Sequence, residues 1–199
     1  GLPADATVFC CFNGTQKIMR RMFDLWLDIL ARTPDSVLWL LGDNDGAVTR
    51  LKKYAETRGI DPNRLVFAKK LPNPEHLARY FLADLFLDTL PYGAHTTASD
   101  ALWMGVPVLT MSGLSFASRV CGSLVRSAGL PEMVCATPEE YRDRAVALGM
   151  DKDALKGLRE KLAAARDTCD LFNMPKLISC LEALYAEMWD AYERGEIPH

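Results

Sequence analysis

Residues 93–100, with the sequence Gly-Ala-His-Thr-Thr-Ala-Ser-Asp, gather polar side chains where an apolar run gives way to a helical pattern. The amino end of a helix offers free backbone N–H groups and a partial positive charge, which together suit a phosphate group. Gly93 lets the backbone approach a ligand closely, and the hydroxyls of Thr96 and Thr97 could donate to a diphosphate. Asp100 lies one helical turn further on, where its carboxylate could accept hydrogen bonds from a ribose diol.

A simpler interpretation of this segment needs no ligand. Thr96 or Thr97 would cap the helix through its side-chain oxygen, as threonine commonly does at this position, and His95 would be an ordinary loop residue. The composition of the segment leaves both interpretations open.

Apolar runs of strand length alternate with amphipathic stretches over the first 137 residues. The runs predict strands over residues 7–12, 36–41, 64–68, 84–88, 107–111 and 133–135. The amphipathic stretches predict helices over residues 15–32, 48–58, 74–82, 96–104 and 115–128. Strands with few polar alternations, separated by helices, are typical of a parallel sheet covered on both faces. Such sheets bind ligands at the carboxyl ends of their strands, where residues 93–100 would lie.

After Thr137 the sequence changes character, and only helices are predicted, over residues 138–148, 152–166 and 175–194. Leu177, Leu181, Leu184 and Met188 form an apolar stripe on the last of them. We expect these helices to pack back on the sheet or to reach a neighbouring domain. The predicted fold is α/β, a Rossmann-like parallel sheet with helices on both faces. It forms one domain over residues 1–199, with a core over 1–137 and C-terminal helices over 138–199.

The composition is typical of a soluble globular protein, with 49% hydrophobic and 25% charged residues among 199. A formal net charge of −3 does not favour nucleic acid, so we expect no nucleic-acid partner. No apolar run approaches the ~20 residues of a membrane helix, so no membrane contact is expected. The start lacks the basic and apolar regions of a signal peptide. It also lacks a methionine, which fits a processed start or a piece of a longer protein.

Several common sites are not predicted. The six cysteines form no CxxC pair and there are three histidines, so we expect buried free thiols in a reducing cytoplasm rather than a zinc site; a disulfide is the alternative. Asp43-Asn44-Asp45 has the DxD spacing of metal-dependent glycosyltransferases, but its polar, glycine-flanked setting predicts a surface turn. The sequence lacks GxGxxG, GxxxxGK[ST] and GxSxG, which argues against dehydrogenases, P-loop proteins and α/β-hydrolases.

The segment around His95 resembles the diphosphate-binding motif of the O-linked N-acetylglucosamine transferases, through His95-Thr96-Thr97, Asp100 and Leu102-Trp103. The resemblance continues in the same order through Phe12-Asn13 with Lys17-Ile18, residues 35–41, Glu75-His76, residues 117–120 and 171–173, Leu184-Tyr185 and Met188-Trp189. It covers essentially the whole chain and corresponds to the C-terminal Rossmann-like half of that family's catalytic region. The resemblance therefore favours a ligand site over a helix cap alone.

The resemblance implies roles for individual residues. Lys17 would face the diphosphate and stabilise the charge that grows on the leaving group; otherwise it is a solvated lysine in a helix's first turn, where cations are disfavoured. His76 would stack on uracil, with the backbone near Leu71 reading the base edge; otherwise His76 is a helix-face histidine without a ligand. Asp100 would hold the ribose hydroxyls. Arg119 matches a family arginine but is assigned no ligand, and a structural ion pair is its alternative.

Two positions depart from the family pattern. Gly14 stands where a glutamine is common, so a side-chain contact to the sugar nucleotide is expected to be missing. Asn73 stands where some members have a lysine in the base-binding loop, and the lost charge should weaken nucleotide binding or alter its selectivity.

The implied reaction is transfer of N-acetylglucosamine from UDP-N-acetylglucosamine to serine or threonine hydroxyls of proteins. Lys17, the amides of Thr96 and Thr97 and the helix dipole would take the place of a metal, and no cofactor is expected. The family's N-terminal catalytic half and tetratricopeptide repeats are missing from this chain, so the chain alone should bind UDP weakly and transfer no sugar. The alternatives are a non-catalytic nucleotide-binding module and a protein-interaction domain that kept the fold.

Overall fold

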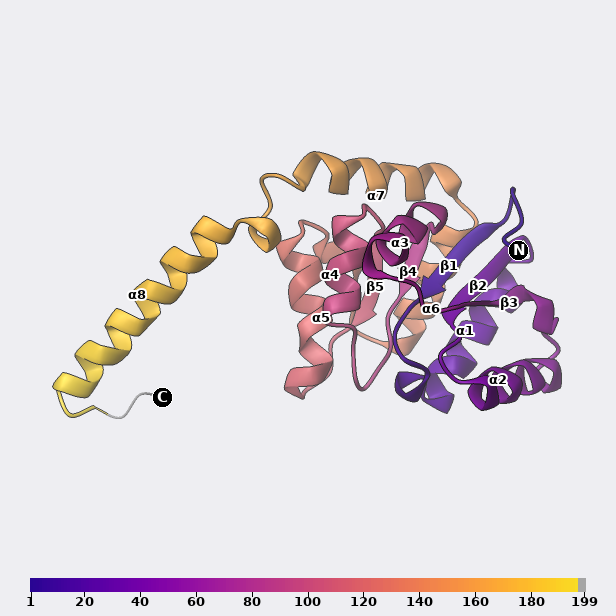
Figure 1. Cartoon of the computed structure of the whole chain (residues 1–199), viewed down its shortest axis with the longest axis horizontal. Helices are drawn as coiled ribbons and strands as arrows, with labels where there is room; N and C mark the ends of the chain where they lie inside the picture. Colours follow the sequence, from indigo (N-terminus) through magenta and orange to yellow (C-terminus); the bar gives the residue numbers. More distant parts are fainter. Residues whose placement is uncertain (197–199) are drawn as a thin grey trace.

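The computed structural model describes residues 1–196 and contains a six-stranded sheet in which every neighbouring pair of strands is parallel (Figure 1). The strands are β1 (Thr7–Cys11), β2 (Ser36–Leu41), β3 (Leu65–Ala68), β4 (Leu85–Leu87), β5 (Val108–Met111) and β6 (Val134–Cys135). The strands β1, β4 and β5 are buried along their whole length. Burial on both faces explains why their sequences are nearly continuous apolar runs.

The strands lie in the order β3-β2-β1-β4-β5-β6. The chain builds β1, β2 and β3 outward to one edge, crosses back, and builds β4, β5 and β6 outward to the other. Its direction therefore reverses between β1 and β4, which pair through Phe9 with Leu85 and Cys10 with Phe86. Open parallel sheets bind ligands beyond the carboxyl ends of the strands at such a reversal. The segments that follow β1 and β4 lie at this position.

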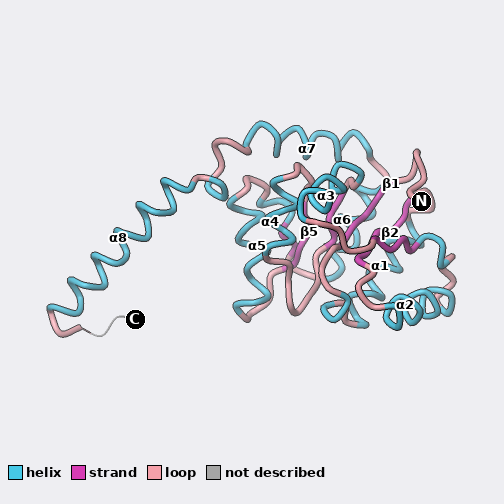
Figure 2. The backbone as a smooth tube through the Cα atoms, in the orientation of Figure 1, coloured by secondary structure: helices cyan, strands magenta, loops and turns pink. Residues whose placement is uncertain are grey.

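Helices cover both faces of the sheet (Figure 2). The helix α1 packs against α6, whereas α4 packs against α5, and both α4 and α5 contact β5. The α-helices are α1 (Arg20–Arg32), α2 (Asp45–Thr57), α3 (Asn73–Ala78), α4 (Thr96–Trp103), α5 (Phe116–Ser127), α6 (Pro138–Gly149), α7 (Lys152–Ala165) and α8 (Met174–Glu193). Short 3-10 helices span Thr15–Lys17, Pro62–Arg64, Arg79–Leu82, Pro131–Met133 and Asp170–Phe172. No helix among residues 1–196 combines the length and apolar character needed to cross a membrane.

A chain of buried hydrogen bonds connects the helical layer to the end of β4. Trp26 in α1 donates from Nε1 to the hydroxyl of Tyr141 in α6 at 3.1 Å, and that hydroxyl donates to the main-chain oxygen of Asp88 at 3.1 Å. Both aromatic side chains are fully buried, and burying such a side chain stabilises the fold by about 1.5–3 kcal/mol. The bonds leave no buried polar atom of the pair unpaired, and they fix the point from which the loop after β4 starts.

All the predicted strands and helices are present, and most boundaries agree within a few residues. The prediction of one helix over residues 15–32 is wrong, because the chain forms a 3-10 turn at Thr15–Lys17 and α1 begins only at Arg20. Met19 is extended and precedes the helix. Lys17 therefore lies in a connecting turn and not in the first turn of α1, which removes the helix-dipole argument made for it.

Two further elements differ from their predicted ranges. The helix expected over residues 48–58 starts at Asp45, because the Asn44 side chain accepts a hydrogen bond from the Ala47 amide at 2.9 Å and caps it. The helix expected over residues 74–82 is α3 followed directly by a 3-10 helix at Arg79–Leu82. This change of helix type buries Arg79 and Tyr80.

The C-terminal helices behave in two ways. Tyr141 and Ala145 of α6 and Leu155 and Leu162 of α7 are buried in the core, so these helices pack back on the body as expected. The helix α8 instead projects away from the body (Figure 1) and has no buried residue, so for this helix only the expected contact with a neighbouring domain remains open. The stripe predicted on α8 faces solvent, with its four side chains 40–52% exposed.

Candidate functional site

The segments after β1 and β4 meet where the sheet order reverses. Lys17 donates from Nζ to the main-chain oxygen of Gly93 at 3.0 Å, and Asn13 donates from Nδ2 to Oγ1 of Thr89 at 2.8 Å. Each bond joins residues 76 positions apart in the sequence. The structure therefore brings Lys17 next to the segment that contains His95, as the sequence predicts.

Asp88 organises the loop between β4 and α4. Its buried carboxylate accepts hydrogen bonds from the amides of Thr89 and Ala94 and from the hydroxyl of Thr110, each at 2.7 Å. Burial raises the pKa of Asp88, and the hydrogen bonds from Thr110, Ala94 and Thr89 oppose that shift. The loop thus bends around one carboxylate, and its hydrogen bonds fix the position of the residues that begin α4.

Gly93 is needed because the loop passes close to α5. A Cβ atom at this position would lie 3.2 Å from Oδ2 of Asp88 and 3.3 Å from the main-chain oxygen of Ala117. The Gly93 amide donates to that same oxygen at 3.0 Å. This close packing is a reason for glycine that the sequence did not indicate, and the close approach to a ligand stays a prediction.

The amino end of α4 is open. His95 occupies the N-cap position and its side chain makes no capping hydrogen bond. Within residues 1–196, the amides of Thr96 and Thr97 have no acceptor. The interpretation of Thr96 or Thr97 as a mere helix cap is therefore wrong, and two N–H groups remain for a ligand.

The hydroxyl of Thr97 is engaged within the protein. It donates to Oδ1 of Asn13, and Asn13 in turn donates to Thr89, whose hydroxyl donates to the main-chain oxygen of Tyr92 at 2.8 Å. Asn13 is 1% exposed and its bond to Thr89 is buried, whereas the bonds at the two ends of this chain are partly buried. Thr97 can therefore offer its amide but not its hydroxyl proton, whereas the side chain of Thr96 is exposed.

Lys17 is held at the loop by two contacts. Besides its bond to Gly93, its Nζ lies 4.0 Å from the centroid of the Tyr92 ring, which is a cation–π distance. Burial lowers the pKa of Lys17, and the negative charge of Asp88 opposes that shift. The ammonium group is thus a partly desolvated cation beside the open end of α4.

His76 lies on α3 among aromatic rings. Its ring centroid is 5.5 Å from that of Phe12 and 5.6 Å from that of Tyr80, both in edge-on geometry. Burial lowers the pKa of His76, as does Arg79, whereas the charge of Asp100 raises it. An imidazole with a lowered pKa is neutral at pH 7, which suits stacking on a base. Just after α3, the Tyr80 hydroxyl donates to the main-chain oxygen of Thr97 in α4 at 3.2 Å, so the two segments meet here.

Arg79 is a residue that the sequence did not single out. It is 7% exposed, donates from Nη2 to the main-chain oxygen of Lys69 at 2.9 Å, and lies 5.5 Å from the centroid of the Phe12 ring. Its Nη1 is buried and has no hydrogen-bond partner within the described residues. A buried donor without a partner is uncommon in folded proteins and costs free energy. Arg79 thus presents a free donor on the His76 side of the site.

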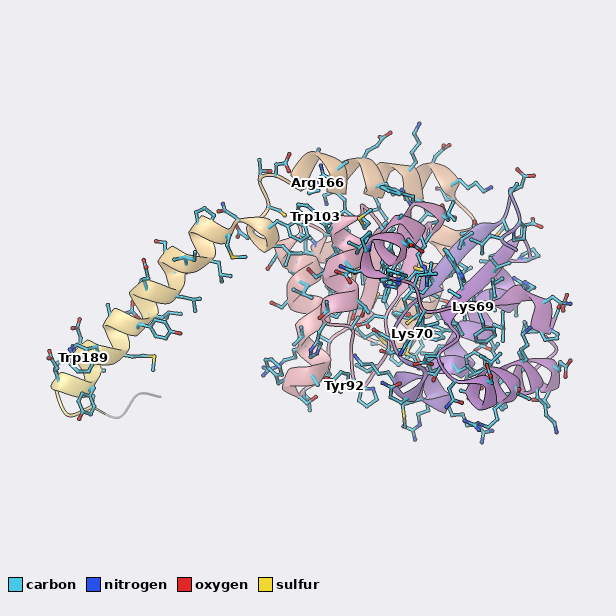
Figure 3. All side chains as sticks on the ribbon, in the orientation of Figure 1. Lys69, Lys70, Tyr92, Trp103, Arg166 and Trp189 are labelled. Atoms are coloured by element: carbon cyan, nitrogen blue, oxygen red, sulfur yellow. The ribbon has the colours of Figure 1, made fainter. Side chains whose placement is uncertain are left out.

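The loop before α3 contains Leu71, whose main chain is expected to contact the base, and leads to Asn73, which stands where some family members have a lysine. The main-chain groups of Leu71 have no hydrogen-bond partner within residues 1–196, so its edge is free. Asn73 is exposed, but Lys69 and Lys70 stand exposed in the same loop (Figure 3), so the loop keeps positive charge. At the other departure, the carboxamide of Gln16 fills the space that a side chain at Gly14 would take.

A surface depression of about 1170 Å³ lies mostly away from these groups. It includes Leu71 and Arg79, extends along α7, and reaches Trp103, whose ring lies 5.3 Å from the Arg166 guanidinium. Figure 3 shows Trp103 and Arg166 at the end of α4 opposite to Tyr92. Because its lining lacks Lys17, His95, Thr96 and Asp100, we place the candidate site at the strand ends, where polar groups converge.

The remaining candidates stay outside the site. Asp43, Asn44 and Asp45 are exposed, as predicted, but they lead into α2 rather than form a turn, with Asn44 as its N-cap and Asp45 as its first residue. Arg119 is exposed and forms no ion pair with any described residue. Within the described part of the chain, no three His, Cys, Asp or Glu side chains are placed to hold a metal ion.

Comparison with known proteins gives consistent matches. Residues 1–181 match glycosyl transferase family 41. The chain is 42% identical over 194 residues to a UDP-N-acetylglucosamine--peptide N-acetylglucosaminyltransferase of Caenorhabditis elegans, covering 98% of this chain and 17% of that protein. It is 38% identical over 199 residues to the probable enzyme SEC of Arabidopsis thaliana, covering 100% of this chain and 20% of that protein. The chain therefore spans about a fifth of the length of these curated relatives.

Solved structures agree with this assignment. A mutant of the Thermobaculum terrenum O-GlcNAc transferase superposes with a TM-score of 0.87 at 38% identity, covering 98% of this chain and 39% of that one. A UDP-N-acetylglucosamine 2-epimerase of Listeria monocytogenes superposes with a TM-score of 0.53 at 16% identity, a likeness of fold alone.

Proposed function

This chain belongs to glycosyl transferase family 41, and on that basis we propose that it is the nucleotide-sugar-binding half of a glycosyltransferase. The proposed reaction moves N-acetylglucosamine from UDP-N-acetylglucosamine to serine and threonine hydroxyls of proteins. The nematode relative is named as an enzyme of this kind. One observation carries the proposal: the Lys17 ammonium lies at the loop that leads into the open amino end of α4.

The proposed binding mode places the diphosphate at that end of α4. The amides of Thr96 and Thr97 would donate to its oxygens, with Lys17 and His95 beside it, and the helix dipole would add a partial positive charge. Asp100, on the same helix, would accept hydrogen bonds from the ribose hydroxyls.

The proposed base pocket lies toward α3. A neutral His76 would stack on uracil, and the free main chain of Leu71 would pair with the base edge. The unpartnered Nη1 of Arg79 supports this side of the proposal, because a carbonyl oxygen of the base would satisfy it.

In the proposed reaction an acceptor hydroxyl oxygen attacks the anomeric carbon of the sugar. A new bond joins that oxygen to the carbon, the bond from the carbon to the phosphate oxygen breaks, the electron pair leaves with UDP, and the hydroxyl proton passes to bulk water. Negative charge grows on the leaving diphosphate, where Lys17 and the α4 amides stabilise it. The proposal assigns no metal or other cofactor, so UDP affinity should be unchanged by EDTA; a loss of binding would contradict this part.

The rest of the enzyme is part of the proposal. The chain spans 39% of the bacterial structure and a smaller share of the curated relatives. We propose that an N-terminal catalytic half and tetratricopeptide repeats supply the acceptor contacts. A cytoplasmic location is also proposed, supported by six cysteines that are all free.

Calorimetric titration of the chain with UDP and with UDP-N-acetylglucosamine tests the site. We expect weak binding of both and no sugar transfer by the chain alone. Absence of binding at millimolar nucleotide would refute the site, and robust turnover by this chain would refute the half-enzyme assignment. In the longer protein, Lys17→Ala should abolish transfer while weakening UDP binding only severalfold. A longer wild-type protein that binds UDP but transfers no sugar would instead favour a module that binds nucleotide without catalysis.

A second candidate function has one observation in its favour. The exposed apolar stripe of α8 could form a protein interface, which would make this chain an interaction domain. Sedimentation of the chain distinguishes the nucleotide-binding function from the interaction function. A chain that binds nucleotide and stays monomeric at all concentrations would give the interaction function no support.

A further inference from the structure

Tyr92 contacts two residues of the proposed site but is not itself among the residues proposed to bind the nucleotide. The Lys17 ammonium lies 4.0 Å from the centroid of its ring. The His95 imidazole stacks on the same ring, with centroids 5.3 Å apart and planes inclined by 18°. One aromatic side chain therefore touches both the cation and the N-cap residue at the amino end of α4.

The main chain holds Tyr92 firmly although its side chain is 47% exposed. Its carbonyl oxygen accepts from the Thr89 hydroxyl at 2.8 Å, and the next amide, of Gly93, donates to Ala117 at 3.0 Å. Its phenol hydroxyl has no hydrogen-bond partner within residues 1–196. The contacts to Lys17 and His95 thus depend on the ring and not on the hydroxyl.

Neither of the two contacted groups is well held without this ring. A lysine has four rotatable side-chain bonds and loses much conformational entropy when fixed; apart from the ring, Lys17 has only the Gly93 carbonyl. His95 Nε2 lies 3.4 Å from the main-chain oxygen of Ala117, a long contact, and Phe116 touches its ring edge-on with centroids 6.2 Å apart. The Tyr92 ring is therefore a main restraint on both side chains.

We propose that Tyr92 is a positioning residue whose ring holds the Lys17 ammonium and the His95 imidazole at the mouth of α4, ready for a diphosphate. This inference rests on the proposed function, because it assumes that the phosphates bind there. It requires that the aromatic ring matter and the hydroxyl not. It also requires that the effect be confined to the phosphate part of a nucleotide.

Nucleotide titration of the whole chain tests both requirements. Tyr92→Leu should weaken UDP binding by about fivefold, the size expected for losing one cation–π contact, whereas uridine, which lacks phosphate, should bind as before. Tyr92→Phe should bind UDP like the wild type. Tyr185→Leu, the same change at an exposed tyrosine of α8, serves as the matched control. Equal weakening of UDP and uridine, or wild-type UDP binding by Tyr92→Leu, would overturn the proposal.

A measurement without nucleotide separates this proposal from the proposed function. In the NMR spectrum of the free chain, the ring current of Tyr92 should shift the ε-methylene protons of Lys17 upfield. Tyr92→Leu should remove that shift and Tyr92→Phe should keep it. If the shift behaves so but UDP does not bind, the proposed function fails while the positioning contact stands. If the shift is absent in the wild type, the positioning role is refuted even when UDP binds.

Discussion

Asp88 illustrates how one buried residue can determine the form of the candidate site. A carboxylate transferred out of water is costly unless hydrogen bonds replace its hydration. Here donors from the loop itself and from β5 do so, and the same bonds fix the path from β4 to α4. The site geometry is thus tied to the satisfaction of a single buried charge.

Asp88→Ala should therefore destabilise the chain. Three donors would lose their acceptor, and an unsatisfied buried donor costs roughly 1–3 kcal/mol, so we expect a loss of about 3 kcal/mol or more. Urea denaturation followed by circular dichroism measures it. Asp167→Ala, at an 86% exposed side chain, should change stability little. Equal stability of the two variants would show that the hydrogen bonds contribute nothing.

Lys17 should make UDP affinity depend on pH in the alkaline range. Burial lowers its pKa, and the ammonium exists only below that pKa, so the charge is lost at a lower pH than in free lysine, whose pKa is about 10.4. UDP affinity should fall as the pH rises through the lowered pKa. The Lys17→Arg variant keeps its positive charge over this pH range. Because uracil titrates equally in both experiments, the UDP affinity of this variant should fall less than that of the wild type. Identical pH profiles for the two proteins would exclude this role.

Sequence reasoning found part of the site and missed the rest for identifiable reasons. His95, Thr96, Thr97 and Lys17 stand in motifs next to predicted strand ends, and the structure brings them together. Arg79 has no such signal, because it becomes notable only when a change of helix type buries it. Its Nη1 is buried without a partner among the described residues, a state that depends on tertiary packing and leaves no pattern in the sequence.

At the scale of elements, the close fit between the 88–95 loop and α5 should be sensitive to mutation. Gly93→Ala would place a methyl group 3.2 Å from Asp88 and 3.3 Å from the Ala117 oxygen. The loop should shift, lowering stability by about 1–3 kcal/mol and weakening UDP binding. Gly157→Ala, within α7 and with open space around it, should instead stabilise by about 0.5–1 kcal/mol. Thermal unfolding of both variants would reveal opposite shifts, and a stabilised Gly93→Ala would disprove the packing argument.

Helix and strand boundaries show which elements a sequence can specify. Continuous apolar runs predicted β1, β4 and β5 well, because central parallel strands are buried on both faces. The break at Ile18–Met19 was missed, since Ile18 continues the helical period of α1 although the chain there is not helical. The apolar period of α8 was recognised, but a period does not reveal whether its partner lies in the same chain.

At the scale of the whole molecule, the projecting α8 should govern the chain's behaviour in solution. Its apolar side chains, including Trp189 at 60% exposure (Figure 3), are more than an isolated monomer usually exposes in one place. We expect concentration-dependent self-association in sedimentation velocity. Leu181→Glu combined with Met188→Glu should reduce it without changing the unfolding temperature, because neither residue is part of the core. A wild-type chain that stays monomeric would contradict this expectation.

The bonds from Lys17 to Gly93 and from Asn13 to Thr89 have a thermodynamic consequence. Because they join segments 76 residues apart, an unfolded chain contains no assembled pocket, and only the native state can take up the nucleotide. Occupancy and folding are then linked: at UDP concentrations 100 times the dissociation constant, the native state gains about 2.7 kcal/mol. The melting temperature of this chain should rise when UDP is added. It should stay constant when the same buffer salts are added without nucleotide. Heat resistance would thus report ligand occupancy without any acceptor protein or sugar transfer.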